Sequence, residues 1–247
     1  MPAMGTTRLD KLVVERGLVE SREKAQRLIM AGKVFVDGQK ADKAGRLYDS
    51  GVTLTVAARE PYVSRGGLKL AHALRFFGLD VRGLVCLDSG ASTGGFTDCL
   101  LQNGARQVFA VDVGKGLLHE TLRRDPRVVA KDGLNARYLK EEHLGGKVDA
   151  AVVDVSFISL TKVLPAVKDV VKPGGWIVTL IKPQFEAGRE AVGRGGVVRN
   201  PAVRAAVVEQ VRQAGTSALN LEWQGVCESP IQGPAGNIEF LALWKRR

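Results

Sequence analysis

The stretch from residue 84 to residue 98 limits the fold of this 247-residue chain more than any other part. It reads Leu-Val-Cys-Leu-Asp-Ser-Gly-Ala-Ser-Thr-Gly-Gly-Phe-Thr-Asp: an apolar run, a turn rich in small residues, and the start of a helical pattern that ends at Gly104. A buried strand, a glycine-rich turn and a helix form the first crossover of a doubly wound sheet, where ligands bind at strand ends. We therefore predict an α/β fold with a mostly parallel sheet and a ligand site at this turn.

The spacing of the glycines indicates which ligand binds. They follow the order G-x-x-x-G-G with an aspartate two residues before the first glycine, whereas dinucleotide-binding turns follow G-x-G-x-x-G. The spacing found here is typical of class I methyltransferases, which use S-adenosylmethionine. From this turn we predict the cofactor-binding residues Asp88, Gly90, Ala91, Ser92, Gly94 and Phe96.

Two more acidic residues follow predicted strands in the same half of the chain. Asp112 closes a strand over residues 107–111, at the position where a ribose diol is hydrogen-bonded in such sheets. Asp132 comes just after a strand over residues 128–130, at a suitable place for an adenine amino group. We expect both residues to bind the cofactor.

The later strands also end in charged residues. Asp154 follows a strand over residues 149–153, and Lys182 follows a strand over residues 176–181. A long glycine-containing loop over residues 184–200 is then expected to hang over the active edge. The last two strands, residues 219–226 and 238–244, are predicted to pair with each other in antiparallel fashion.

The N-terminal part has the pattern of a small separate module. A helical stripe of apolar residues ends at Gly17, and Ser21 is a natural N-cap for a second helix. Short strands are expected around the tight-turn signal Asp37-Gly38. We predict a small α+β domain over residues 1–58, a linker over residues 59–66 and a methyltransferase-like domain over residues 67–247.

Composition narrows the class of protein and of partner. The chain has 36 Lys and Arg against 26 Asp and Glu, a formal net charge of +10, which favours a nucleic-acid partner over a membrane. A merely basic soluble protein is the alternative. The scattered cysteines fit buried thiols in a reducing cytosol, and neither cysteines nor histidines show metal-ligand spacing. We predict a cytoplasmic protein that needs no metal and contacts no membrane; its oligomeric state is left open.

The N-terminal module resembles the small RNA-binding domain first described in a small-subunit ribosomal protein, the S-four type. The likeness covers roughly residues 8–56 and rests on R-L-D-x-x-L, G-L-x-x-S-R-x-x-A-x-x-L-I and G-x-V-x-V-D-G. Such domains grip phosphates of folded RNA with basic side chains. A protein–protein adaptor with a solvated helix face is the alternative. The expected RNA-binding residues are Arg8, Arg22, Arg27, Lys33, Lys40 and Lys43, with Arg65 from the linker.

The rest of the chain resembles the FtsJ-type methyltransferases. The matching motifs are D-S-G-A-S-T-G-G-F-T-D, D-x-S-F-I-S-L, L-I-K-P-Q-F-E and G-N-I-E-F. With the N-terminal module, they resemble the TlyA group, the haemolysin A family of ribosomal RNA 2′-O-methyltransferases. The resemblance implies a catalytic tetrad at Lys69, Asp154, Lys182 and Glu239, with ribosomal RNA or ribosomal subunits as partner and cytidine as the expected nucleotide. Gly133-Leu134-Asn135 departs from the Arg-Thr-Asn common in that group.

The chemistry of such a tetrad suits ribose methylation. A 2′-hydroxyl is a poor nucleophile until its proton is taken or oriented. We expect Lys182 to be the base, Lys69 to be a neighbouring positive charge, and Asp154 and Glu239 to orient the two lysines. One rival is a non-catalytic RNA-binding protein that uses the methyltransferase fold as a scaffold. A remote rival is a haemolysin that forms pores, although the sequence has no barrel pattern and no long apolar helix.

Overall fold

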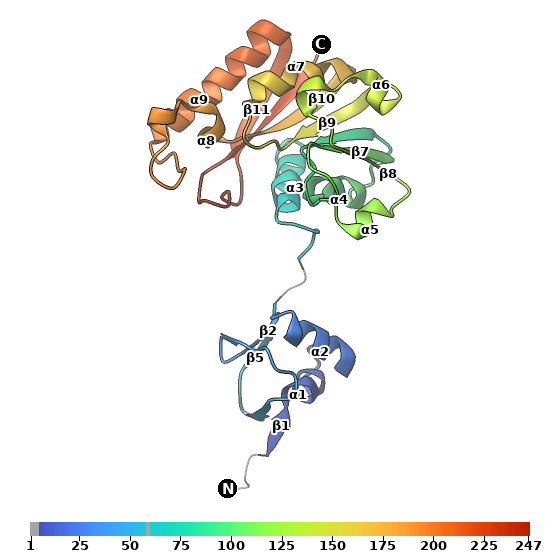
Figure 1. Ribbon diagram of the computed structural model, residues 1–247, viewed down its shortest axis with the longest axis vertical. Coiled ribbons are helices and arrows are strands. Elements are labelled where there is room, and N and C mark those ends of the chain that lie inside the picture. Colours follow the sequence, from blue (N-terminus) through green and yellow to red (C-terminus); the bar gives the residue numbers. More distant parts are fainter. Residues whose placement is uncertain (1–4, 58–59) are drawn as a thin grey trace. The chain divides into compact units, whose positions relative to one another are not determined.

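The computed structural model describes residues 5–57 and 60–247, and Figure 1 shows how their elements are arranged. The chain divides into two compact units, residues 1–59 and residues 60–247. The predicted domain boundary, between residues 58 and 59, lies outside the described residues. Each unit is described by itself below.

The N-terminal unit is a small α+β fold. Helices α1 and α2 pack on a core that includes Leu9, Val13 and Ile29, all with no exposed surface. Ser21 caps α2 as predicted, because its side chain accepts a hydrogen bond from the backbone N–H of Lys24. The elements are β1 (Thr6–Arg8), α1 (Leu9–Glu15), α2 (Arg22–Met30), β2 (Val34–Val36), β3 (Gln39–Lys40), β4 (Leu47–Asp49) and β5 (Leu54–Val56).

Two short antiparallel sheets complete this unit. The order in one is β3-β2-β5, and β1 pairs with β4 in the other. The strands β1 and β4 are not expected from the sequence, since three-residue strands with mostly polar residues show no apolar alternation.

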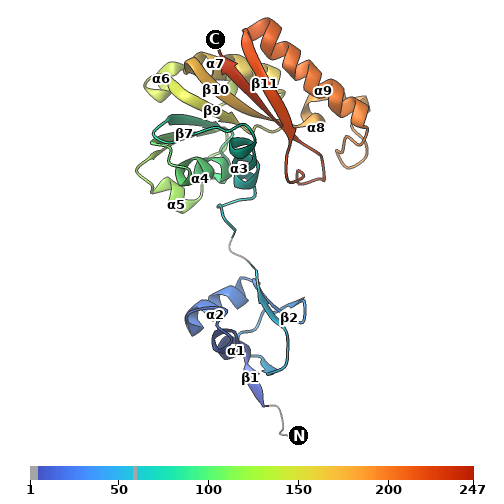
Figure 2. The same ribbon diagram turned by 180° about the vertical axis from the view of Figure 1, so that it is seen from behind.

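The C-terminal unit is built on a twisted sheet of order β11-β12-β10-β9-β6-β7-β8, seen from behind in Figure 2. Pairs from β10 through β8 are parallel, whereas β12 is antiparallel to both β10 and β11. The mostly parallel sheet and the antiparallel last pair are therefore confirmed. The strands are β6 (Val85–Ser89), β7 (Gln107–Asp112), β8 (Val128–Asp132), β9 (Val148–Val153), β10 (Val171–Ile181), β11 (Leu221–Glu228) and β12 (Phe240–Arg246).

Helices cover both faces of this sheet (Figures 1 and 2). On one face α3, α4 and α5 bury Leu70, Leu100 and Leu122, and on the other α6, α7 and α9 bury residues such as Leu164 and Val211. The helices are α3 (Gly66–Phe76), α4 (Gly95–Gln102), α5 (Glu120–Arg123), α6 (Glu141–Leu144), α7 (Leu160–Val170), α8 (Pro183–Glu186) and α9 (Pro201–Gln213), with 3₁₀ turns at Ala136–Tyr138 and Arg189–Ala191 and a π-helical turn at Ala214–Ala218.

The structure differs from the sequence prediction around the linker. The predicted linker, residues 59–66, is in large part fixed to the C-terminal unit. The N–H of Val63 donates to Asp98 at 2.8 Å, the carbonyl of Pro61 accepts from Gln102 at 2.9 Å, and α3 already begins at Gly66. Residues 61 and 63 are thus hydrogen-bonded to α4 of the C-terminal unit.

Topology brings the strand ends to one edge. The parallel strands β6, β7, β9 and β10 end at Ser89, Asp112, Val153 and Ile181, so the residues after them gather there. Because β12 runs the opposite way and Phe240 pairs with Ile181, Glu239 lies just before β12 at the same edge. Within residues 5–57 and 60–247, no helix is long and apolar enough to span a membrane.

Candidate active site

A cavity of about 1240 Å³ opens at this edge, next to the turn after β6. Gly90, Ser92 and Asp112 are among the residues that line it. Gly90 has φ = +85°, and a Cβ atom there would lie 2.3 Å from the carbonyl oxygen of Asp154. Only glycine therefore lets this turn approach the loop after β9 so closely.

Two backbone hydrogen bonds fix the carboxylate of Asp112 at the cavity wall. Its oxygens accept hydrogen bonds from the backbone N–H groups of Ser92 at 2.8 Å and Gly114 at 2.7 Å. A carboxylate fixed in this way can accept hydrogen bonds from a diol, because each oxygen has a second lone pair. Asp112 therefore lies beside the turn after β6, at the wall of the larger cavity.

Three predicted cofactor residues lie differently. Asp88 is fully buried and holds the hydroxyl of Thr97 at 2.6 Å instead of lining the cavity, and burial raises the pKa of Asp88 to about 7. The carboxylate of Asp132 accepts from Arg123 at 2.9 Å and from the N–H of Gly116 at 3.1 Å. Gly94 has φ = +98° and faces side chains of the 118–122 segment. None of the three lines either cavity.

A smaller cavity of about 650 Å³ adjoins the first and holds the predicted tetrad. Gly90, Ser92 and Asp154 line both cavities, while Ala91 and Phe96 line the smaller one. Lys69, Lys182 and Glu239 also line the smaller cavity, so the structure brings the tetrad together from four separate elements of the chain.

The tetrad forms two ion pairs. On α3, the Lys69 ammonium lies 2.5 Å from the Glu239 carboxylate, and the two side chains are only 9% and 1% exposed. The Lys182 ammonium lies 2.5 Å from Asp154 and donates to the hydroxyl of Ser156 at 2.8 Å. Each buried ammonium thus has a carboxylate partner, which compensates the cost of removing the charges from water.

An aromatic surface stands beside the second pair. The Phe157 side chain is 90% exposed, which is unusual for a large apolar residue, and its backbone has φ = +63°. Its ring lies 5.1 Å from the ring of Phe185, which in turn lies 5.9 Å from the Lys182 ammonium. Both rings line both cavities. A left-handed, bulky, solvent-exposed residue at a cavity is a candidate ligand contact.

The sequence analysis did not identify Phe157 or the residues that support the site. Glu186, at the end of α8, accepts from the Ser159 hydroxyl at 2.6 Å and from the Leu160 N–H at 2.7 Å. It therefore ties the segment after β10 to the start of α7, and burial raises its pKa. Asn237, 1% exposed, accepts from the Val198 N–H and donates to the Gly196 carbonyl. These residues belong to the motifs that resemble the FtsJ-type methyltransferases, but their spacing in the sequence assigns them no role.

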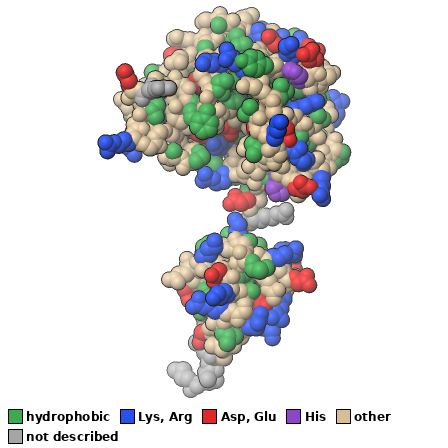
Figure 3. Space-filling view, viewed as in Figure 1, with side chains coloured by type: hydrophobic (Ala, Val, Ile, Leu, Met, Phe, Trp, Pro, Cys, Tyr) green, Lys and Arg blue, Asp and Glu red, His purple; other side chains and the backbone are tan. Residues whose placement is uncertain are grey.

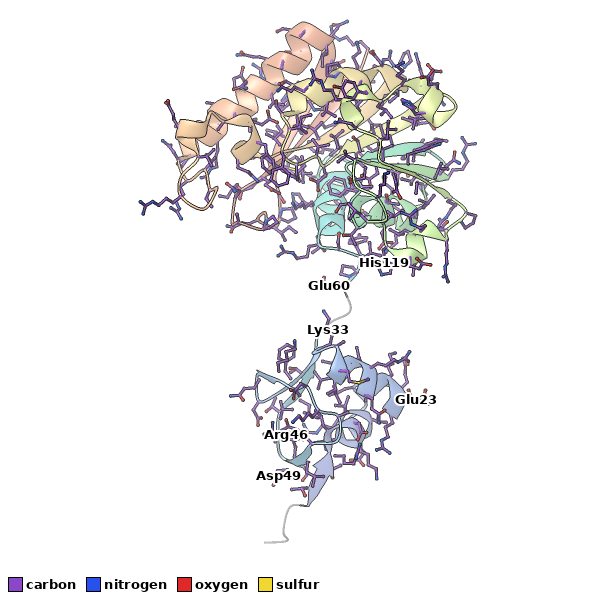
Figure 4. The ribbon with its side chains drawn as sticks, in the orientation of Figure 1. Glu23, Lys33, Arg46, Asp49, Glu60 and His119 are labelled. Atoms are coloured by element: carbon purple, nitrogen blue, oxygen red, sulfur yellow. The ribbon has the colours of Figure 1, made fainter. Side chains whose placement is uncertain are left out.

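The predicted RNA-binding residues form one group only in part. In the N-terminal unit Arg8 and Arg22 both bind the carboxylate of Asp10. Lys33 lies at the end of that unit opposite Asp49 (Figure 4), whereas Arg8 belongs to β1, the strand that pairs with the strand of Asp49. Lys and Arg side chains are scattered with acidic ones over the visible face of this unit (Figure 3). Arg27, Lys33, Lys40 and Lys43 are exposed, and Arg65 lines the smaller cavity of the C-terminal unit.

Metal ligands do not cluster in the part of the chain that the structure describes: no group of three or more His, Cys, Asp or Glu side chains could hold an ion there. The smaller cavity holds the two lysine–carboxylate pairs.

The fold and this site define a Rossmann-like methyltransferase. The solved structure of fibrillarin from Aeropyrum pernix, in complex with S-adenosyl-L-methionine, superposes with a TM-score of 0.52 at 17% identity, covering 86% of this chain and 94% of fibrillarin. At that identity the likeness shows the fold alone.

Closer relatives identify the family. The FtsJ-like methyltransferase model matches residues 62–246, and the S4 domain model matches residues 7–54. The chain is 48% identical over 243 residues (97% of it, 89% of the relative) to the 16S/23S rRNA (cytidine-2′-O)-methyltransferase TlyA of Mycobacterium tuberculosis. A solved structure from Streptococcus thermophilus, provisionally named a hemolysin, shares 46% identity with a TM-score of 0.75, covering 99% of this chain and 90% of that one. The chain belongs to the TlyA family of FtsJ-like methyltransferases with an N-terminal S4 domain, as its motifs predict.

Proposed function

We propose that this protein transfers a methyl group from S-adenosylmethionine to the 2′-hydroxyl of a cytidine in ribosomal RNA. The observation that carries the proposal is the pairing of two buried lysines with two carboxylates in the smaller cavity. The nucleotide and the RNA class follow the Mycobacterium tuberculosis relative, which is named for that activity.

The larger cavity suits the cofactor. The close approach at Gly90 and the fixed carboxylate of Asp112 would hold the amino-acid and ribose parts, respectively. Bound S-adenosylmethionine would supply a methyl group bonded to a positively charged sulfonium. Transfer of that methyl group would need neither a metal nor an acid.

The chain's own residues handle the proton. Lys182, in its unprotonated form, accepts the proton of the ribose 2′-hydroxyl, while Asp154 and Ser156 fix the position of its nitrogen. The Lys69–Glu239 pair places a second ammonium in the same cavity, where it can bind the ribose or its phosphate. Holding the hydroxyl in line with the methyl group contributes most to catalysis, because positioning of reactants can lower an activation barrier by on the order of 7 kcal/mol or more.

Nucleic acid is the substrate class that the surroundings favour. The exposed ring of Phe157 is a stacking surface for a nucleobase, and base–aromatic stacking contributes about 1–3 kcal/mol. Arg65 lines the same cavity and can contact a phosphate.

The test is methyl transfer from labelled S-adenosylmethionine to ribosomal RNA, naked and assembled in subunits. Wild-type protein should label the RNA, and Lys182→Ala should bind both substrates but transfer no label. Lys245→Ala, which removes an exposed lysine from β12, is the matched control and should retain full transfer. RNA binding without any transfer by the wild type would favour the rival in which the methyltransferase fold is only a scaffold.

A further inference from the structure

The segments that follow β9 and β10 carry two residues of the proposed mechanism, and neither segment is stabilised by its own secondary structure. The loop over residues 154–159 contains Asp154 and forms neither a helix nor a strand. The chain after β10 contains Lys182 and then the single helical turn α8, Pro183–Glu186. A helix of one turn is unstable alone. The position of Lys182 relative to Asp154 therefore depends on the contacts between the two segments.

Two of these contacts involve groups that the proposed reaction uses. The Lys182 ammonium lies 2.5 Å from Asp154 and donates to the Ser156 hydroxyl at 2.8 Å. The rings of Phe157 and Phe185 lie 5.1 Å apart. When Lys182 is unprotonated and ready to accept a proton, it carries no charge that attracts Asp154. The ring of Phe157 is the proposed stacking surface for RNA, so both contacts are expected to change during turnover.

The third contact is made by Glu186, a described residue that lines neither cavity. Its carboxylate accepts hydrogen bonds from the Ser159 hydroxyl at 2.6 Å and from the Leu160 N–H at 2.7 Å. Ser159 gives its only hydroxyl proton to Glu186, so the Thr161 hydroxyl, at 2.8 Å, must donate to Ser159. The carboxylate also lies at the N-terminus of α7, where the helix dipole favours a negative charge. These bonds do not depend on the charge of Lys182.

The position of Glu186 is coupled to that of Lys182 through the backbone of α8. The N–H of Phe185 donates to the carbonyl of Lys182 at 2.9 Å, and the N–H of Ala187 donates to the carbonyl of Pro183 at 2.9 Å. Pro183 also restricts its own backbone and that of Lys182 before it. If Glu186 loses its partners, the turn can shift, and Lys182 shifts with it.

We propose that Glu186 is a positioning residue for the methyl transfer, because it fastens α8 to the loop over residues 154–159 and keeps the Lys182 nitrogen in place while that lysine is uncharged. The two hydrogen bonds from Ser159 and Leu160 are called the Glu186 cross-link below. The role in methyl transfer rests on the proposed function, whereas the cross-link does not. A misplacement of about 1 Å at a reacting group can reduce a rate roughly a hundredfold, so a residue outside the cavities can govern kcat.

The first measurement compares turnover with binding in the full chain, using labelled S-adenosylmethionine and ribosomal RNA. Glu186→Ala removes both hydrogen bonds and should lower kcat about 10- to 100-fold. The KM for RNA and the calorimetric affinity for S-adenosylmethionine should stay within about twofold of the wild type, because Glu186 lines neither cavity. Glu190→Ala, which removes an exposed carboxylate a little further along the chain, is the matched control and should keep full kcat.

The conservative variant distinguishes the cross-link from an effect of charge. The side chain created by Glu186→Gln can accept from the Leu160 N–H through its oxygen and donate to the Ser159 oxygen through its nitrogen, so both bonds survive without the charge. It should retain at least about a third of the wild-type kcat. Ser159→Ala removes one of the two bonds and should give an intermediate kcat. Adding Ser159→Ala to Glu186→Ala should lower kcat little further, because the partner is already gone.

A second measurement needs no substrate. Hydrogen exchange of the backbone amides over residues 154–160 reports how firmly the loop is held. Exchange should be faster in Glu186→Ala than in the wild type, and unchanged in Glu186→Gln and Glu190→Ala. Exchange in the central strands β6 and β7 should be the same in all variants, which shows that they are folded.

The outcomes separate the alternatives. Wild-type kcat in Glu186→Ala, or equal losses of kcat in Glu186→Ala and Glu186→Gln, would overturn the proposal. Weaker S-adenosylmethionine binding with unchanged kcat would overturn it too, because Glu186 would then support the cofactor cavity. If Glu186→Ala does not fold, Ser159→Ala decides by the same measurements. A wild type that transfers no methyl group would refute the proposed function, whereas faster exchange in Glu186→Ala would still establish the Glu186 cross-link.

Discussion

Breaking the Lys69–Glu239 pair should destabilise the C-terminal unit strongly, and restoring neutrality should rescue stability but not activity. The two side chains are 9% and 1% exposed, and their charged atoms are 2.5 Å apart. Lys69→Met alone leaves a buried carboxylate and Glu239→Gln alone leaves a buried ammonium. Removing one partner of such a pair costs about 3–5 kcal/mol.

The double variant tests the physical reason. With both charges gone, no ion remains unpaired in the smaller cavity, so we expect unfolding free energy within about 1–2 kcal/mol of the wild type. The coupling between the two changes should then be at least about 2 kcal/mol in favour of the double variant. Methyl transfer should be lost in Lys69→Met and in the double variant, because the proposed mechanism needs the second ammonium. It should also be lost in Glu239→Gln, because the Lys69 ammonium then loses the carboxylate that orients it.

Urea unfolding followed by tryptophan fluorescence is a suitable assay. The three tryptophans of the chain, Trp176, Trp223 and Trp244, all lie in the C-terminal unit, so their signal reports that unit and not the RNA-binding one. Single variants within about 1 kcal/mol of the wild type would mean that the pair is solvated, contrary to its burial. Additive losses in the double variant would show that each residue acts through its packing and not through the ion pair.

Three further outcomes are expected. Asp112→Ala should weaken S-adenosylmethionine binding severalfold in calorimetry through the lost diol hydrogen bonds, and an unchanged affinity would remove Asp112 from the cofactor site. Asp88 has a pKa of about 7 in the fold against roughly 3.9 unfolded, so its ionisation should lower the stability of the fold as pH rises from about 4 through 7. Asp88→Asn should therefore be more stable than the wild type at pH 8, by about 1–3 kcal/mol, but not at pH 5. Equal stability differences at the two pH values would contradict the buried ionisation. Phe157→Ala should raise KM for RNA while S-adenosylmethionine affinity is retained, whereas Phe157→Tyr should behave nearly as the wild type; equal losses in both variants would argue against stacking.

Local pattern was sufficient to predict the scaffold of the site. The apolar run before Gly90, the strand ends at Asp112 and Asp154, and the cap at Ser21 are short-range features, and each appears where the sequence places it. The positions of Lys69 and Glu239 came from the family resemblance. Nothing local marks them, because one lies on a helix and the other precedes an antiparallel strand 170 residues away.

The sequence could not predict the features of the site that depend on the direction in which a side chain points. Asp88 and Asp132 occupy strand ends, as Asp112 does, yet one is buried against Thr97 and the other pairs with Arg123. The sequence assigns Phe157 no role, whereas in the structure its backbone is left-handed and its side chain is 90% exposed. The sequence likewise assigns Asp10 no role, although its buried carboxylate pairs with two arginines.

Nucleoside mass spectrometry of the RNA product tests the central claim most directly. Ribosomal RNA is incubated with S-adenosylmethionine and either the wild-type chain or Lys182→Arg, then digested to nucleosides. We predict 2′-O-methylcytidine from the wild type and none from Lys182→Arg, because a guanidinium stays protonated and cannot accept the hydroxyl proton. A methyl group on a base, or 2′-O-methylcytidine formed at a near-normal rate by Lys182→Arg, would contradict the proposed chemistry at Lys182.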